Sequence, residues 1–374
     1  MKGISQALAA FEAAKDKIAE AERRQLAVWE GDCRELPLLL TANISSKFSE
    51  NLRRYNPKEI HRDSEKMFAN GLLDALRALA GGGDAVPSIR ANMGCSAFPS
   101  LFGVTPLLFE DKMPWVKKHL SRQQIANLKP GEIAPNNDIF LALEHMSFMR
   151  DQLQNSPVRI YPPDLQGPFD MAHIVYGDAI FYDLYDDPQF VHYLMELCCQ
   201  AIIIGMEQCL QAIPDSERLI AHYSNLVIPK AMGGLKISED TSTLLSRDCI
   251  DEFVIPYTSR VLEHFGGGYI HYCGKNDHLF ESMLSLNKVI GINFGNPEMH
   301  DMDMILSKIA KAGKLYYGHV NSLPGENERE FFARVLKASG GRILLAYDAG
   351  DRDTEEIMND WRESKYILAN ISDA

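Results

Sequence analysis

The chain has 374 residues, 46% of them hydrophobic and 24% charged, which is the composition of an ordinary globular protein. Its formal net charge of −13 argues against nucleic acid and anionic membranes as partners, because both are bound through clustered basic residues. No apolar run reaches the roughly 18 residues of a membrane-spanning helix, and the seven cysteines lack disulfide-like spacing, so we expect a cytoplasmic protein.

The first segment is predicted to be helical, because apolar residues recur near helical spacing from Ser5 to Arg24. We therefore expect residues 1–25 to form an N-terminal helix that packs on a single domain formed by residues 26–374.

Eight short apolar runs follow, most of them bounded by Gly, Pro, Asn or Asp, which commonly end strands. They are Leu26–Trp29, Val86–Ile89, Val158–Tyr161, Gly234–Ile237, Gly268–His271, Val289–Asn293, Leu315–Gly318 and Ile343–Ala346. Helical patterns lie between several of them, for example from Asp248 to Phe265, with Ser246 as the expected N-cap. Strands that alternate with helices predict a parallel sheet, and eight such units predict an α/β fold of the (β/α)8 TIM barrel class.

The first connections of this barrel are long, and residues 33–85 and 92–157 are predicted to carry helical insertions. An open, doubly wound sheet is the alternative fold. We disfavour it because no G-x-G-x-x-G motif follows the first predicted strand, and Gly81–Gly83 follows a helical segment.

Polar side chains gather where the predicted strands end, which is where the active sites of such barrels lie. The candidates are Asp164, Gln166, Glu239, Asp240, His271, Cys273, Asn293, His319, Asn321 and Asp348. Converging carboxylate, imidazole and thiol groups indicate a site. The alternative is structural, because Asn and Asp also favour turns and helix caps.

His271 and Cys273 carry the sharpest signal in this set. They lie two residues apart on a predicted strand, so both side chains point to the same face. An imidazole and a thiolate together suit zinc, and a catalytic zinc needs a third protein ligand. The residues alone leave that third ligand open among five candidates: Asp348, Glu239, Cys95, Cys33 and His319.

Several segments together resemble the uroporphyrinogen decarboxylase superfamily. They are Asp164–Asp170, Asp186–His192, Ile250–Tyr257, His271–Gly274 and Gly318–Asn321, within roughly residues 155–350. The resemblance implies a (β/α)8 barrel. The decarboxylase branch carries an Arg-Gln-Ala-Gly-Arg run near its first strand, whereas Val28–Arg34 lacks it, so tetrapyrrole decarboxylation is disfavoured.

The chain is more similar to the zinc-dependent corrinoid methyltransferase branch, through His271 and Cys273. The resemblance implies that both residues bind zinc and that the third ligand is a Cys near the last strand. Here Asp348 stands at that position, so the implied metal ligands are His271, Cys273 and Asp348. An oxygen ligand in place of sulfur makes the donor set harder in the Lewis acid–base sense, which changes the thiols or methyl donors that the metal would activate.

The implied function is methyl transfer between a corrinoid carried by a partner protein and a small thiol or methylated organic substrate, by a monomer or homodimer. We predict catalytic or metal-supporting roles for Glu239, His319 and Asp164. The predicted substrate-binding residues are Gln166, Phe169, Asp240, Asn293 and Asn321. Asp240 can alternatively complete the zinc shell.

Two other classes of function remain open. A cofactor-independent lyase acting on a different carboxylated substrate would use Asp164, His319 and Asn321, and a non-enzymatic barrel would only bind a ligand. Bound zinc separates the methyltransferase from both.

Overall fold

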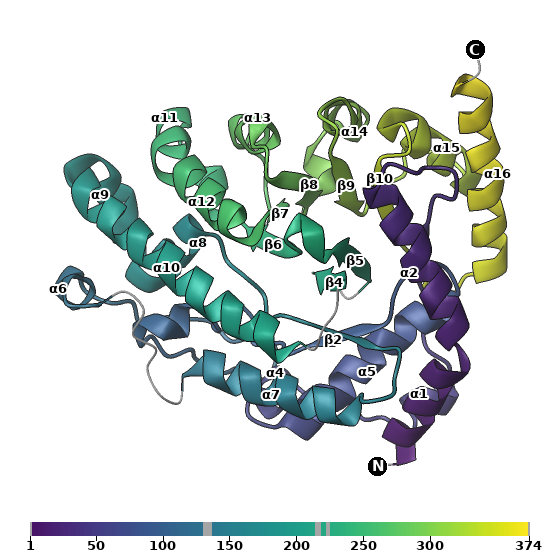
Figure 1. Ribbon diagram of the computed structural model, residues 1–374, viewed down its shortest axis with the longest axis horizontal. Coiled ribbons are helices and arrows are strands. Elements are labelled where there is room, and N and C mark those ends of the chain that lie inside the picture. Colours follow the sequence, from purple (N-terminus) through teal and green to yellow (C-terminus); the bar gives the residue numbers. More distant parts are fainter. Residues whose placement is uncertain (1, 130–136, 214–217, 222–224, 373–374) are drawn as a thin grey trace.

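A computed structural model of the protein describes residues 2–129, 137–213, 218–221 and 225–372 (Figure 1). Its strands are β1 (Leu38–Thr41), β2 (Ser88–Arg90), β3 (Arg159–Tyr161), β4 (Arg218–Ala221), β5 (Leu226–Pro229), β6 (Leu235–Ser238), β7 (Gly268–Tyr272), β8 (Val289–Phe294), β9 (Leu315–Gly318) and β10 (Ile343–Asp348).

The helices lie mostly outside the sheet (Figure 1). The α-helices are α1 (Lys2–Ala13), α2 (Lys15–Trp29), α3 (Ser46–Ser49), α4 (Pro57–Ile60), α5 (Ser64–Gly81), α6 (Arg122–Ala126), α7 (Asp138–Gln152), α8 (Pro168–Tyr176), α9 (Ala179–Asp186), α10 (Pro188–Ala212), α11 (Arg247–Cys249), α12 (Ile255–Phe265), α13 (Asp277–Ser285), α14 (Met302–Lys311), α15 (Glu328–Ser339) and α16 (Thr354–Ser372). Short 3-10 turns are η1 (Pro99–Phe102), η2 (Lys230–Met232), η3 (Thr241–Leu244) and η5 (Pro297–Met299), and η4 (Ile250–Val254) is a π-helical turn.

Six strands form one parallel sheet in the order β1-β10-β9-β8-β7-β6, and β2 pairs with β3 in a second parallel ladder. The two ladders meet at a single bridge, where Gln166 lies opposite Ser238 at the end of β6. β4 and β5 form a separate antiparallel hairpin. This arrangement is TIM-barrel-like, as expected from the alternation of strands and helices.

The predicted closed barrel is not what the hydrogen bonds show, because in the described chain no pairing joins β1 to β2. The edge of β1 that does not pair with another strand forms backbone hydrogen bonds with α5 and the turn after it. Ala42 N donates to Arg77 O at 3.1 Å, and Asp84 N donates to Leu38 O at 2.8 Å. Gly81 allows this approach, because a Cβ at that position would overlap Leu40 O.

The predicted first strand was wrong: Leu26–Trp29 is the last turn of α2, and the first strand is Leu38–Thr41. Val28 and Trp29 are buried, but Leu26 is only half-buried, so the run follows one face of a helix. A four-residue apolar run does not distinguish the two structures. The predicted helix from Ser5 to Arg24 is also two helices, α1 and α2. The other predicted strands overlap β2, β3 and β6 to β10, with bounds that differ by up to two residues.

Helix α2 is fixed to the start of the sheet by buried hydrogen bonds. Trp29 Nε1 donates to Val227 O at 2.7 Å, and Gln25 Nε2 donates to Asp84 O at 2.6 Å. The Arg159 guanidinium on β3 pairs with Glu22 at 2.6 Å. These contacts lie at the amino ends of the strands, opposite the end where the candidate site residues gather.

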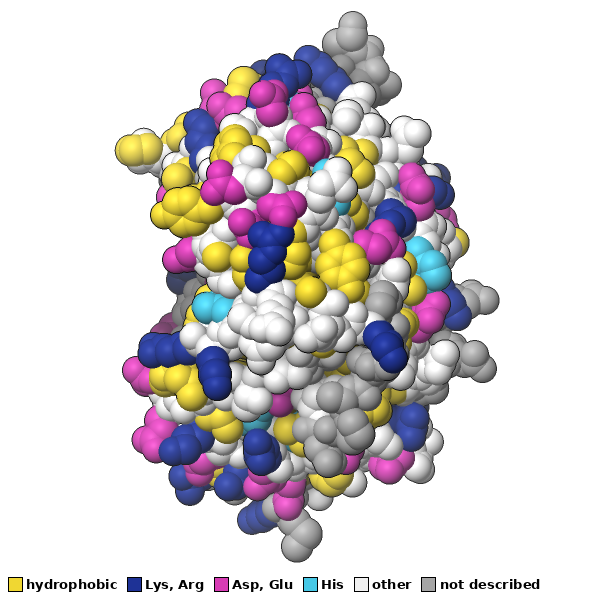
Figure 2. All heavy atoms as spheres, turned by 90° about the vertical axis from the view of Figure 1, so that its left-hand side faces the viewer, with side chains coloured by type: hydrophobic (Ala, Val, Ile, Leu, Met, Phe, Trp, Pro, Cys, Tyr) yellow, Lys and Arg dark blue, Asp and Glu magenta, His cyan; other side chains and the backbone are white. Residues whose placement is uncertain are grey.

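One helix in the described chain, α10, is long and apolar enough to cross a membrane by length and composition. Half of its apolar window is buried in the protein, against α8, α12 and α7. Cys198, Cys199 and Cys209 lie on this buried face, as expected for core thiols. The helix therefore behaves as the core helix of a globular domain. Figure 2 shows the face over α6, α9 and α11, where acidic and basic side chains are interspersed.

The contact between α5 and β1 predicts unequal costs for two adjacent glycine substitutions. Gly81→Ala places a methyl group against the Leu40 backbone, so we expect it to lower the free energy of unfolding by about 3 kcal/mol or more. Gly82→Ala is the matched control: no atom lies within 4 Å of its added Cβ, and only its φ of 65° is unfavourable, costing about 1 kcal/mol. Urea unfolding measures both, and equal costs would contradict the packing of α5 on β1.

Candidate metal centre

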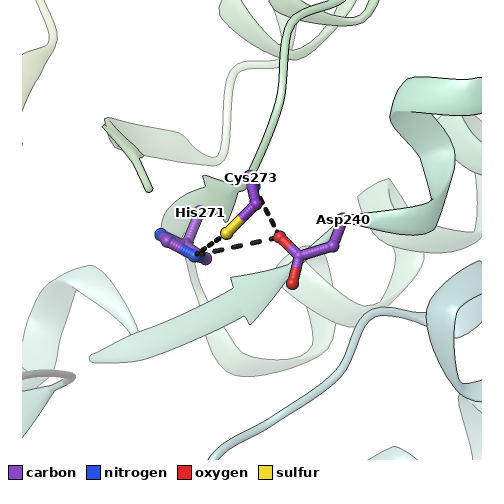
Figure 3. A group of neighbouring side chains, drawn as sticks. All are labelled: Asp240, His271 and Cys273. Atoms are coloured by element: carbon purple, nitrogen blue, oxygen red, sulfur yellow. Dashed lines mark hydrogen bonds and ion pairs between the residues drawn. The ribbon is translucent and has the colours of Figure 1, made fainter. Parts of the chain in front are cut away.

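Three side chains from two neighbouring strand ends converge at the carboxyl end of the sheet: Asp240, His271 and Cys273 (Figure 3). One donor atom from each lies within 4.8 Å of the others. His271 Nε2 is 3.7 Å from Cys273 Sγ and 3.8 Å from Asp240 Oδ1. His271 is buried, Asp240 is partly buried and Cys273 is exposed, so the cluster opens to solvent on the thiol side.

The loop after β6 is held in place by backbone donors. Asp240 Oδ1 accepts a 2.6 Å hydrogen bond from Cys273 N, which ties the β6 end to the β7 end. The buried Asp170 carboxylate on α8 accepts from Asp240 N at 2.7 Å and from Thr241 N at 2.8 Å. Asp240 is therefore positioned beside the two residues of β7 by hydrogen bonds that the sequence pattern does not reveal.

Asn293 on β8 fixes the orientation of the His271 ring. The Asn293 amide nitrogen donates to Tyr317 O, so its oxygen is left to accept a hydrogen bond from His271 Nδ1. This arrangement leaves a lone pair on Nε2, directed at Cys273 and Asp240. Burial lowers the pKa of His271, and the Lys236 charge lowers it further, so the imidazole is in the neutral form that binds metals.

The charge of Lys236 favours a Cys273 thiolate, but opposing effects outweigh it. Partial burial, together with the neighbouring Asp240 carboxylate, raises the pKa of Cys273 to about 11. A divalent cation reverses this effect, because a coordinating thiol is deprotonated outright.

Glu239, next to Asp240, is fully buried and faces away from this cluster. Ser242 Oγ donates to one carboxylate oxygen at 2.8 Å, and Thr258 Oγ1 donates to the other at 2.5 Å. Burial raises the pKa of Glu239 to about 7 despite these hydrogen bonds. Its backbone N donates to His271 O at 2.8 Å. Glu239 therefore supports the β6–β7 junction, and both of its carboxylate oxygens are already engaged.

The donor set fits zinc. Ligand bonds of about 2.0 to 2.3 Å in a tetrahedral site separate the ligand atoms by roughly 3.4 to 3.6 Å. The separations of 3.7 and 3.8 Å from His271 Nε2 are close to that range. Three protein ligands leave a fourth position for a substrate or water, which is the pattern of catalytic zinc.

The third donor beside His271 and Cys273 is Asp240, and Asp348 lies elsewhere. Asp348 Oδ2 accepts from Arg77 at 2.8 Å, and its Oδ1 accepts from Thr41. Cys33 contacts Gly341 O at the amino end of β10, away from the strand ends that form the cluster. Cys95 is half-buried, and burial raises its pKa to about 12.

The remaining predicted residues lie in different surroundings. Asp164 pairs with Lys236 Nζ at 2.5 Å, and the buried Gln166 donates to Asp164 at 3.3 Å. Phe169 is fully buried in the hydrophobic core on α8 and packs on Phe181. Asn321 is exposed in the loop after β9.

A cavity of about 440 Å³ adjoins the cluster inside the sheet, and we call it the lumen cavity. Its lining includes Asn293, Gly295 and His319. Gly295 also touches the cluster, because a Cβ there would overlap Cys273 Sγ. The missing side chain at Gly295 therefore leaves the thiol accessible beside the cavity, which has the size of a small-molecule site.

No protein-family model matches the chain, and no curated protein matches it in sequence. Its structure is similar to that of a methyltransferase from Methanosarcina mazei, with a TM-score of 0.66. The two share 13% sequence identity over 92% of this chain and 98% of the other. At this identity the similarity shows a shared fold.

Zinc affinity distinguishes Asp240 from Asp348 as the third metal ligand. We expect Asp240→Asn to weaken zinc binding at least about tenfold. Loss of a residue that only supports a metal ligand already weakens metal binding by about this factor, and loss of a ligand itself should weaken it at least as much. Asp348→Asn is the matched control and should bind zinc like the unaltered protein. Competition with a chromogenic chelator measures both affinities. The assignment fails if Asp348→Asn weakens zinc binding and Asp240→Asn does not.

Gly295→Ala tests whether the thiol must lie open beside the lumen cavity. The added methyl group overlaps Cys273 Sγ, so we expect reduced zinc affinity and slower alkylation of Cys273 by iodoacetamide. Gly325→Ala adds a Cβ with no atom within 4 Å of it, so it controls for effects of a glycine-to-alanine change that do not come from contact with Cys273. Unchanged zinc affinity and alkylation in Gly295→Ala would show that Cys273 does not occupy this position.

Proposed function

We propose that the protein is a methyltransferase that moves a methyl group between a corrinoid on a partner protein and a small thiol or methylated organic substrate. His271, Cys273 and Asp240 would hold the zinc ion that activates the nucleophile. The convergence of these three donors at one strand edge, beside an open cavity, carries the proposal. The fold shared with a methyltransferase supports it.

When bound, zinc would lower the pKa of a substrate thiol so that a thiolate is present near neutral pH. In the proposed reaction the thiolate sulfur would attack the methyl carbon and form a sulfur–carbon bond. The corrinoid would be the leaving group and would keep the electron pair of the broken cobalt–carbon bond. The thiol proton would pass to solvent. The reverse sequence would load the corrinoid from a methylated substrate.

The chain's own residues would mainly hold the metal ligands and the substrate in position. Asn293 holds the His271 ring so that Nε2 faces the centre, and Asp170 holds the loop that carries Asp240. Gly295 leaves space for substrate beside Cys273. Catalysis of this kind rests on generating the nucleophile and holding it near the methyl group.

Free methylcobalamin and 2-mercaptoethanol test the proposal without knowledge of the partner protein. We expect zinc-loaded protein to demethylate methylcobalamin under anaerobic conditions, with formation of the thioether, as followed by the visible spectrum and mass spectrometry. Asp240→Asn and Cys273→Ser should lower the rate at least about a hundredfold, a loss typical of removing an activating group.

Asp348→Asn should keep the activity, because Asp348 pairs with Arg77 away from the cluster. Folded Cys273→Ser protein that retains full zinc and full activity would exclude the proposal. If the protein takes up no zinc, the cofactor-independent lyase becomes the favoured function.

A further inference from the structure

The charged side chains in the wall of the lumen cavity are already matched with opposite charges. Among the described residues that line it, Asp74 and Arg77 carry charge, and both belong to α5. Arg77 Nη2 donates to Asp348 Oδ2 at 2.8 Å, and Arg54 Nη2 donates to Asp74 Oδ1 at 2.6 Å. The two positive and two negative charges of these pairs therefore cancel beside the cavity.

The Arg77 guanidinium is also occupied in its geometry. Arginine binds a carboxylate best through two parallel N–H groups. Here one terminal nitrogen donates to Asp348 and the other donates to Asn43 Oδ1 at 2.8 Å. An anion that entered the cavity would have to displace these partners. The net charge of −13 on the whole chain further opposes the approach of an anion.

The other polar groups of the wall include an imidazole and an amide that can hydrogen-bond an uncharged ligand. His319 and Asn225 both line the cavity. Desolvation lowers the pKa of His319, and the Asp348 carboxylate opposes this shift only in part, so the imidazole is uncharged near neutral pH. These side chains therefore offer hydrogen bonds to a ligand without a counter-ion for it.

Much of the remaining wall is apolar or aromatic. It includes Leu39, Phe294, Pro297, Tyr317, Ala346 and Tyr347. An apolar wall with a few polar groups is the usual composition of a site for a small organic molecule. Moving a charged group from water into such surroundings without a counter-ion costs free energy, whereas an uncharged polar group needs only a hydrogen-bond partner.

We propose that the lumen cavity binds an uncharged small molecule with an aromatic or apolar body. Its polar end hydrogen-bonds Asn225 or His319, and its body packs on the apolar wall. Because the cavity adjoins Cys273 at Gly295, this molecule is the substrate of the methyl transfer: a neutral thiol or a neutral methylated compound. That last step rests on the proposed function, whereas binding in the cavity does not.

Isothermal titration calorimetry with 4-methylbenzamide and 4-methylbenzoate tests the charge preference. The two probes share one body and differ in charge, and the full chain is used without zinc or methyl donor. We expect the amide to bind at least about tenfold more tightly, because the carboxylate meets arginines that are already paired.

Asp74→Asn should relax this preference, because it removes one negative charge from the wall and releases Arg54 from its partner. We expect 4-methylbenzoate to bind about threefold more tightly and 4-methylbenzamide to bind unchanged, as suits one partly exposed charge. Asp303→Asn is the matched control. Asp303 is 47% exposed, against 49% for Asp74, and it pairs with Arg334 at 2.7 Å away from the lumen cavity.

Alkylation by iodoacetamide, mapped by mass spectrometry, shows where the amide binds. Saturating 4-methylbenzamide should slow alkylation of Cys273 beside the cavity and leave alkylation of Cys33, at the amino end of β10, unchanged. The proposal is overturned if the two probes bind equally, if the benzoate binds more tightly, if the amide does not bind at millimolar concentration, or if it leaves Cys273 unprotected. Absence of zinc binding or methyl transfer, with the amide preference intact, would count against the proposed function alone.

Discussion

The site depends on the parallel register of three adjacent strands. Ser238 on β6 lies opposite His271 on β7, and His271 lies opposite Asn293 on β8. The strand ends therefore bring Asp240, the His271 imidazole and the Asn293 amide side by side. A shift of one residue in β7 would turn His271 to the other face of the sheet, because side chains alternate along a strand. The donor cluster is thus a consequence of sheet register.

The second constraint is the close approach of α5 to β1. Helix α5 takes the hydrogen bonds that β2 would make in a closed barrel, through Arg77 O and the turn at Asp84. Asp74 on the same helix lines the lumen cavity. Helix α5 therefore occupies the gap in the ladder, where two strands would otherwise pair, and also forms part of the wall of the lumen cavity. A glycine at position 81 makes that approach sterically possible.

Part of the site was predictable from the sequence. The two-residue spacing on a strand predicted that His271 and Cys273 face the same way, and the structure brings their donor atoms within 3.7 Å. The third position was assigned to Asp348 by analogy with a family pattern. Asp348 instead pairs with Arg77, a partner 271 residues away in sequence that spacing does not reveal. Asp240 directly follows the β6 end, beside the buried Glu239, and only the hydrogen bond from Cys273 N shows which carboxylate turns toward the histidine.

The sequence by itself determined the alternation of helices with the parallel strands β2, β3 and β6 to β10, and the shared face of His271 and Cys273, because both follow from local periodicity. Leu26–Trp29 marks where that information ends, since four apolar residues suit a helix turn as well as a strand. Only the tertiary structure decided that Asp240 joins the donors and that α5 keeps the ladder open. These features depend on contacts between residues distant in the chain, which no local pattern encodes.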